Sequence, residues 1–199
     1  MKLKHASAFL LASVAMLASA AESPSDTFTA DGKLRRPADV REYVYLSSGI
    51  GMAYGPARER AAGEPPFTNV YVKPEAYRAF MKSGVWPDGS VFLLEIRRGV
   101  ANASVDSSGR TQGAPLALEA SVKDTTRYPD GGWAYFDFGS TQKPLDSAAP
   151  QPRSASCYSC HSKHGAVEWS FTQFYPEQFA VAQQKGTVRK DYDPNRKAE

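Results

Sequence analysis

A five-residue motif near the carboxyl end of the chain is its most constraining feature. Cys157, Cys160 and His161 form the pattern Cys-x-x-Cys-His, and these two cysteines are the only ones among 199 residues. Two thiols at this spacing can form thioethers with the two vinyl groups of one porphyrin, and the adjacent imidazole can then reach the iron. The motif therefore predicts covalently attached haem c with His161 as the iron ligand, and any fold of the chain has to present these three side chains together.

Other interpretations of the motif use the same residues. A coincidental match is one, and a small Cys-x-x-Cys disulfide in an exported protein is another. Structural zinc is disfavoured because such a site needs four ligands. After the first 20 residues the chain offers only His161 and His164 as imidazoles.

The amino terminus indicates export. A basic start at Lys2 and Lys4 precedes an apolar stretch, residues 6–17, and residues 18–20 form a small-residue cleavage site. We therefore expect residues 1–20 to be a cleaved signal peptide and the mature protein to be periplasmic. The apolar stretch is shorter than the about 20 residues that a membrane span requires, and no second such run follows, so no membrane span is expected.

The distribution of polar and charged residues along the chain favours one domain with polar segments at both ends. Residues 21–38 are polar and predict a flexible leader, residues 39–186 form the expected domain, and the charged residues 187–199 are expected to be a frayed tail. The formal net charge is only +3, far from a polybasic surface, so nucleic acid is not an expected partner. The chain has neither a glycine-rich phosphate loop nor a serine nucleophile elbow.

Periodicity predicts an α+β fold, which is mainly an antiparallel β-sheet with flanking helices and the c-type haem on one side. Strand-like alternation occupies residues 69–72, 90–98, 116–123, 133–138 and 167–175. Helices are expected after the cap Asp39, over residues 74–81, around the Cys-x-x-Cys-His motif, and over residues 176–185. Along residues 90–98, alternation places Phe92 and Leu94 on one face and Glu95 on the other, where a salt bridge is the simplest role for the carboxylate.

Several segments together resemble the cytochrome P-460 and cytochrome c′-beta family. They are Pro66-Phe67-Thr68, Val70-Tyr71-Val72, Leu118-Glu119-Ala120-Ser121-Val122-Lys123-Asp124, Trp133-Ala134, the Cys-x-x-Cys-His motif and Phe171-Thr172-Gln173-Phe174-Tyr175-Pro176. The resemblance covers residues 41–177. It implies a predominantly antiparallel β fold with flanking helices, a homodimer, and one five-coordinate haem.

One departure from the family pattern bears on activity. Cytochromes P-460 carry a lysine bonded to the porphyrin edge, directly before a glutamate on the strand after an Asp-Gly turn, and this cross-link accompanies hydroxylamine oxidation. Counting from Asp88-Gly89 to Glu95 places Leu94 at that position. The resemblance therefore favours the cytochrome c′-beta side of the family, whose members have an uncross-linked haem with an apolar distal face and bind gases such as nitric oxide and carbon monoxide.

With this resemblance, Phe92 and Leu94 become candidates for the distal wall of the haem pocket, and Phe67 joins them through the family's Pro-Phe-Thr. All three can equally be ordinary core side chains. An apolar wall admits neutral diatomics but gives little help to peroxide or oxidation chemistry, which needs an acid or base. We therefore expect a binder of a small gaseous or nitrogen-oxide ligand, with no catalytic residue assigned.

Two other functions stay open. An electron-transfer cytochrome would use Met52 or Met81 as a sixth iron ligand and a redox partner protein. A haem oxidoreductase acting on hydroxylamine or nitric oxide would need the missing lysine or a distal acid–base group. Three further polar residues keep open roles: Glu119 is structural or lies at a dimer contact, His164 is a solvent-exposed neighbour of His161, and Arg153 meets a haem propionate or the proximal side, or is a solvated loop residue.

Overall fold

The computed structural model describes residues 27–52, 63–102 and 104–196. The expected signal peptide, residues 1–20, lies outside these residues. The elements in chain order are β1 (Leu34–Arg35), η1 (Val40–Glu42), β2 (Val44–Ile50), β3 (Phe67–Val72), α2 (Pro74–Ser83), β4 (Val91–Ala101), β5 (Arg110–Lys123), β6 (Trp133–Ser140), β7 (Ser147–Ala148), α3 (Ser156–His164), η2 (Thr172–Phe174) and α4 (Pro176–Lys185).

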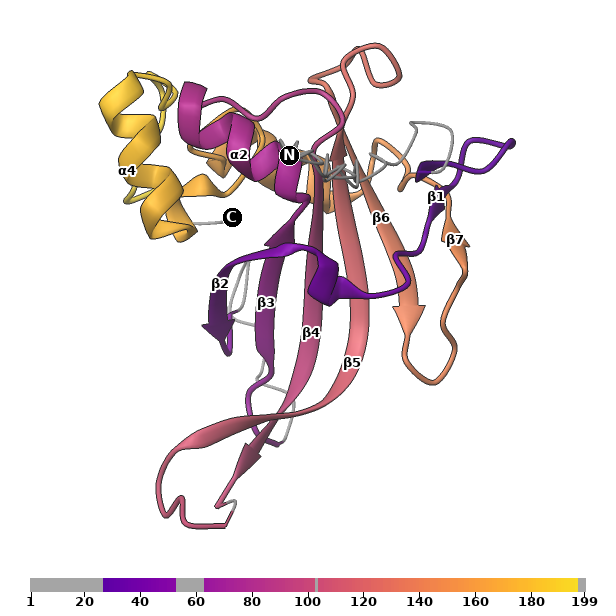
Figure 1. Cartoon of the computed structure of the whole chain (residues 1–199), viewed down its shortest axis with the longest axis vertical. Helices are drawn as coiled ribbons and strands as arrows, with labels where there is room; N and C mark the ends of the chain where they lie inside the picture. Colours follow the sequence, from indigo (N-terminus) through magenta and orange to yellow (C-terminus); the bar gives the residue numbers. More distant parts are fainter. Residues whose placement is uncertain (1–26, 53–62, 103, 197–199) are drawn as a thin grey trace, which may run out of the picture.

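Five antiparallel strands form the main sheet in the order β2-β3-β4-β5-β6, so each strand pairs with its neighbour in sequence (Figure 1). A separate two-stranded sheet joins β1 to β7. This arrangement confirms the predicted α+β class with a mainly antiparallel sheet. Among the residues that the structure describes, no helix has the length and apolar character of a membrane span.

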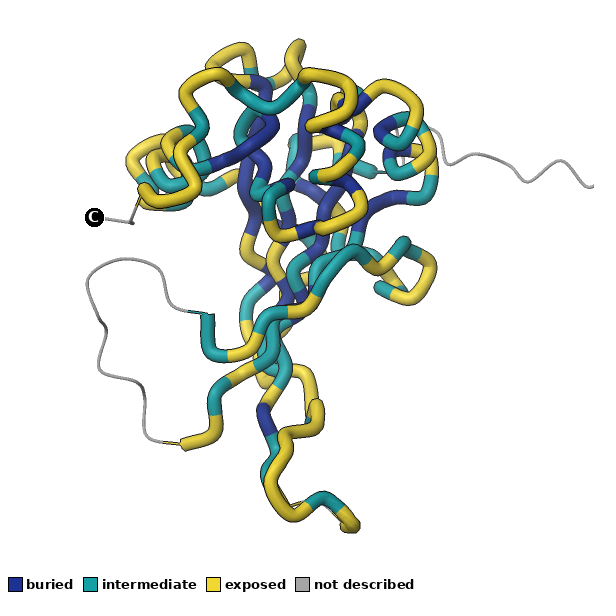
Figure 2. The backbone as a smooth tube through the Cα atoms, turned by 90° about the vertical axis from the view of Figure 1, so that its left-hand side faces the viewer, coloured by how far each residue is buried: buried dark blue, intermediate teal, exposed yellow. Residues whose placement is uncertain are grey.

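The pleat of the sheet divides the core into two apolar clusters. On one face, Phe92 packs with Phe80 of α2, with Trp86, and with residues of α3 and α4. On the other face, Leu93 packs with Leu34 of β1 and with residues of β5 to β7. The indole of Trp86 stacks on Phe80 with ring centroids 3.9 Å apart. The buried residues concentrate in the half of the molecule that the helices cover, whereas the residues at the far end of the β4–β5 hairpin are exposed (Figure 2).

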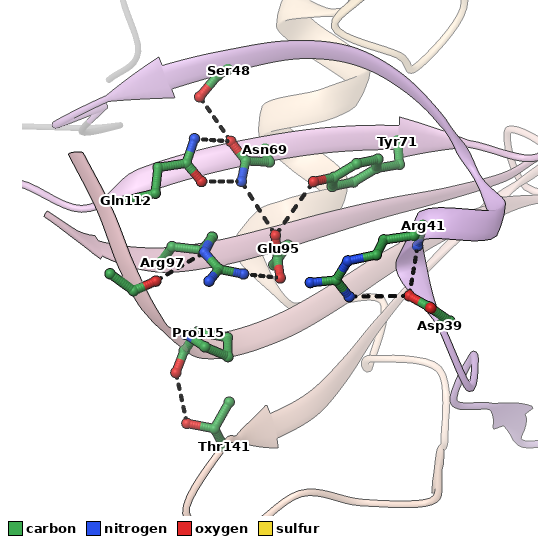
Figure 3. A network of polar contacts seen from close by, with 11 residues as sticks. Asp39, Arg41, Ser48, Asn69, Tyr71, Glu95, Arg97, Gln112, Pro115 and Thr141 are labelled. Atoms are coloured by element: carbon green, nitrogen blue, oxygen red, sulfur yellow. Dashed lines mark hydrogen bonds and ion pairs between the residues drawn. The ribbon is translucent and has the colours of Figure 1, made fainter.

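A polar network surrounds Glu95 (Figure 3). Glu95 lies on the same face of the sheet as Leu93, because residues two positions apart on a strand share a face. Glu95, only 7% exposed, accepts hydrogen bonds from Asn69 Nδ2 at 3.2 Å and Tyr71 Oη at 3.4 Å. Its other oxygen pairs with Arg97 Nη1 at 2.8 Å. A buried carboxylate needs such partners to offset its desolvation. The expected salt bridge on the face away from Phe92 is thus confirmed.

Two segments adopt structure that the sequence pattern did not indicate. Asp39 caps a helix as predicted, accepting a hydrogen bond from Arg41 N, but this helix is only η1. The chain then becomes β2, because Val44 and the residues after it pair with β3. The expected strand over residues 167–175 is wrong: Val167 and Ser170 form an isolated bridge, and η2 follows. Glu168, with φ of 53°, turns the chain back before a strand can extend.

The described parts of both chain ends make contacts with the rest of the protein. Leu34 is 1% exposed and pairs with Ala148, because it fills the apolar cluster on the Leu93 face. After α4, Thr187 Oγ1 donates to Gly84 O at 2.6 Å, and Arg189 N donates to Ala166 O at 2.8 Å. Thr187 therefore holds this segment to the end of α2, and Arg189 holds it to the loop that follows α3.

Candidate functional site

A cavity of about 720 Å³ is lined by α3 and by the face of the sheet that carries Phe92. Its size lies within the range of about 300–1,000 Å³ typical of cofactor and ligand clefts. Residues from β2 to β6 and from η2 complete the lining. The cavity is thus built from segments far apart in sequence, which the antiparallel register brings side by side.

Strand register arranges the floor of the cavity in two cross-strand rows. One row runs Val70, Leu94, Glu119, Asp137 and the next runs Val72, Phe92, Ser121, Tyr135, each from β3 to β6. All of these residues except Val72 line the cavity. The first row passes from apolar side chains on β3 and β4 to carboxylates on β5 and β6. The floor therefore has an apolar end and an acidic end.

The structure brings two of the three candidate distal residues to this cavity. Phe92 and Leu94 line it, and Phe92 also contacts the aromatic core, with its ring centroid 4.7 Å from that of Trp86. Phe67 is not among the lining residues. Phe67 and Asn69 point to the face of β3 opposite to that of Val70, because residues an odd number of positions apart on a strand point to opposite faces.

Helix α3 presents the Cys-x-x-Cys-His motif to the cavity, as the predicted short helix should. Cys157, Cys160 and His161 all line it, because spacings of three and four residues return to the same helix face. Both cysteines are free thiols. Burial raises the pKa of each thiol, so the thiols are mostly protonated at neutral pH.

His161 is held in one orientation by its surroundings. Its Nδ1 donates to the backbone oxygen of Trp169 at 2.8 Å, which leaves Nε2 as the nitrogen that can bind a metal. The ring lies 4.1 Å from Phe171 and 4.4 Å from Tyr135, measured between centroids. Burial lowers the pKa of His161 to about 4, against a smaller opposing effect of the Trp169 hydrogen bond. The imidazole is therefore neutral at physiological pH, the form that ligates metals.

The carbonyl that orients His161 belongs to a tightly braced turn, residues 165–170, which we call the proximal loop. Lys123 Nζ, at the end of β5, pairs with Glu168 Oε1 at 2.6 Å and donates to Trp86 O at 2.6 Å. Arg189 Nη1 donates to Glu168 O at 3.3 Å and also to Ser162 O. This support was not predictable from the sequence, because a backbone acceptor has no residue signature. Of the residues involved, Lys123 lies within the segment that resembles the family.

Arg153 braces the outer side of α3. Its guanidinium lies 4.2 Å from the ring centroid of Tyr158 and 5.3 Å from that of Trp169, and Nη2 donates to Asp130 O at 2.7 Å. Arg153 is exposed and lies against α3 and against Trp169 of the proximal loop. Cation–π contacts of this kind contribute about 0.5–1 kcal/mol at exposed sites.

The cavity also holds polar groups that the sequence did not assign to it. Glu119 faces it beside Leu94 and Asp137, and burial, followed by the charge of Asp137, raises the pKa of the Glu119 carboxyl. Glu119 keeps solvent access through the cavity, while protein atoms around it still displace part of its water. Lys163 and His164 line the cavity from α3, and Met52 lines it next to β2. The other candidate ligand, Met81, packs in the core, 3.8 Å from Gln178 Nε2.

These residues fit haem and define the protein as a haem protein of the cytochrome type. Two unbonded thiols and a neutral imidazole with Nε2 available share one cavity of suitable size. A comparison with family models agrees: the Cytochrome P460 model matches residues 37–172. The chain belongs to the cytochrome P460 family, and the predicted resemblance is confirmed. Among curated proteins, no sequence matches the chain.

Proposed function

We propose that the protein is a periplasmic mono-haem c-type cytochrome whose five-coordinate haem binds small gases such as nitric oxide. One observation carries the proposal: a single oriented imidazole on α3 shares its cavity with the apolar row end formed by Val70 and Leu94 and with Phe92. When bound, haem would supply an iron that can bind neutral diatomic gases. The pocket walls then decide which ligands enter.

The residues of the chain divide this task. Cys157 and Cys160 would tether the porphyrin, and His161 Nε2 would bind the iron while the Trp169 carbonyl holds the ring. Phe92 and Leu94 would exclude water and offer no hydrogen-bond donor, so they disfavour bound dioxygen relative to nitric oxide or carbon monoxide. Leu94 also stands where the family's cross-linking lysine would be, which supports an unmodified porphyrin.

Absorption spectroscopy of the purified holoprotein tests this proposal. We expect the ferrous protein to be high-spin and five-coordinate, and we expect its Soret band to shift when nitric oxide is added. A Met52→Leu variant should give the same resting spectrum, because methionine is not expected to bind the iron. A low-spin resting spectrum that becomes high-spin in Met52→Leu would instead identify an electron-transfer cytochrome with a redox partner.

We further propose that the exported chain begins after residue 20 and forms a homodimer. The amino-terminal pattern supports the first point, and the family resemblance supports the second. Tyr45 and Ile50 on the edge strand β2 are about half exposed, which is consistent with an apolar contact surface. The intact mass and the solution mass of the exported protein measure both; a monomer, or a chain that retains residues 1–20, would refute the corresponding point.

A second function, oxidation of hydroxylamine or nitric oxide, is favoured by the carboxylate of Glu119 in the cavity. A positioned base of this kind contributes typically about 10²–10⁴-fold to a reaction that releases protons. The base must be ionised, and the pKa of Glu119 is raised by burial. Turnover should therefore increase as the pH rises through a pKa above the usual glutamate value of about 4.3.

The Glu119→Gln variant tests this second function. If the protein is an oxidase, hydroxylamine turnover with an external electron acceptor should fall by roughly 10²-fold or more, and its rise with pH should disappear. Glu177→Gln, an exposed glutamate of α4, is the matched control and should keep the wild-type rate. Wild-type protein that consumes no hydroxylamine, or a Glu119→Gln rate equal to wild type, removes this candidate.

A further inference from the structure

One backbone oxygen on the proximal loop accepts two side-chain hydrogen bonds. Trp169 O receives the Nδ1 hydrogen of His161 at 2.8 Å and the hydroxyl hydrogen of Tyr135 at 3.3 Å. Tyr135 comes from β6, and its ring packs directly against that of His161 with centroids 4.4 Å apart. The hydroxyl and the imidazole are thus paired through the same acceptor.

The acceptor has little freedom to favour one donor by moving. Glu168, the residue before Trp169, is held through its side chain by Lys123 and through its carbonyl by Arg189. On the other side, Ser170 N and Ser170 Oγ both donate to Val167 O, at 3.0 Å and 2.7 Å. The backbone of Gly165 lies so close to that of Glu168 that a Cβ at position 165 would be 2.7 Å from Glu168 O. The position of the Trp169 carbonyl is therefore set by the loop.

Sharing this oxygen weakens the bond that the imidazole makes. A carbonyl has two lone pairs and can accept both donors, but both draw on the same partial negative charge. A weaker Nδ1–H···O bond leaves the imidazole less electron-rich at Nε2, and this hydrogen bond is the contact through which surrounding residues tune a metal-bound histidine. A less basic Nε2 gives a weaker iron–nitrogen bond and a higher reduction potential.

We propose that Tyr135 is a positioning residue of the haem site, whose hydroxyl competes with His161 for the Trp169 carbonyl and thereby weakens the iron–histidine bond. This inference rests on the proposed function only in that His161 binds the iron, and it is independent of which gas binds. The proposed effect depends on the hydroxyl of Tyr135 and not on its ring. Phenylalanine at this position therefore removes the competing donor and keeps the ring packed against His161.

The experiment compares Tyr135→Phe with Tyr158→Phe in the ferrous holoprotein. Tyr158 is a matched control, because its ring also packs on Tyr135 with centroids 4.9 Å apart, yet its hydroxyl donates to Gln151 O at 3.1 Å and not to the proximal loop. In Tyr135→Phe, the iron–histidine stretching frequency in resonance Raman spectra should rise and the reduction potential should fall. Tyr158→Phe should leave both near the wild-type values.

Three outcomes overturn the inference. They are an unchanged frequency in Tyr135→Phe, a shift to lower frequency, and an equal shift in Tyr158→Phe, which would indicate a general packing effect. Raman spectra of the wild-type protein report independently whether His161 binds the iron. A haem protein that shows the stretching band but binds no nitric oxide would refute the proposed function and leave this inference standing.

Discussion

A variant in which Cys157 and Cys160 are both serine is expected to lose all covalently bound haem. Both thiols line the cavity from one face of α3, and serine hydroxyls of nearly the same size cannot form the thioethers. The intact mass of exported protein, measured after denaturation, should fall by the mass of the prosthetic group relative to wild type. A haem stain of the denaturing gel should be blank for the variant.

Ser159→Ala is the matched control for this variant. Ser159 lies between the two cysteines on α3, and its hydroxyl donates only to the backbone of Ser156 in the part of the chain that the structure describes, at 3.1 Å. This variant should retain the full haem mass. Wild-type protein without the added mass, or the double variant with it, would contradict covalent attachment through these thiols.

Replacement of His161 by glycine is expected to remove the iron–histidine bond while both thioethers remain. The ring is packed between Tyr135 and Phe171, so its removal leaves space of the imidazole's own shape beside the Trp169 carbonyl. The mass of the denatured variant should still include haem, whereas the stretching band of the iron–histidine bond should be absent. Added imidazole should restore that band, because it can fill the space and donate to the same carbonyl.

His164→Gln provides the comparison for His161→Gly. His164 is the other histidine of α3 and also lines the cavity, so a general effect of losing an imidazole from this helix would appear in both variants. We expect a wild-type band in His164→Gln without added imidazole. A native band in His161→Gly would show that another residue binds the iron.

Strands β3 to β6 were predictable because their apolar residues alternate, whereas β1, β2 and β7 were not expected. The Pro-Asp-Gly-Gly turn chemistry between β5 and β6 indicated an antiparallel hairpin. The helices α2 and α4 were predictable from proline at their first turn. The helix expected after Asp39 was mostly wrong, because the short apolar pattern of residues 40–46 fits a helix or a strand. Pairing with β3 decides in favour of the strand β2. The segment 167–175 failed because its turn depends on a left-handed Glu168, a conformation that residue identity does not favour.

The candidate site was predictable only where chemistry is local. The Cys-x-x-Cys-His motif indicates its own ligand set, and alternation along β4 correctly placed Phe92 and Leu94 on one face. Phe67 does not line the cavity, because it lies three residues from Val70 on β3 and therefore points to the opposite face of the sheet. Glu119 was missed because its position beside Leu94 depends on the β4–β5 register, which no single segment of sequence contains.

The residues proposed to hold the haem and those that form the floor of its cavity come from separate parts of the chain. The Cys-x-x-Cys-His motif and the proximal loop lie within residues 157–170, whereas the floor of the cavity comes from β3 to β6, earlier in the chain. A substitution at Leu94 or Glu119 therefore changes the polarity of the cavity without changing the Cys-x-x-Cys-His motif. Under the proposed function, exchanges at these sheet positions would change which ligands the pocket favours and would leave the motif on α3 intact.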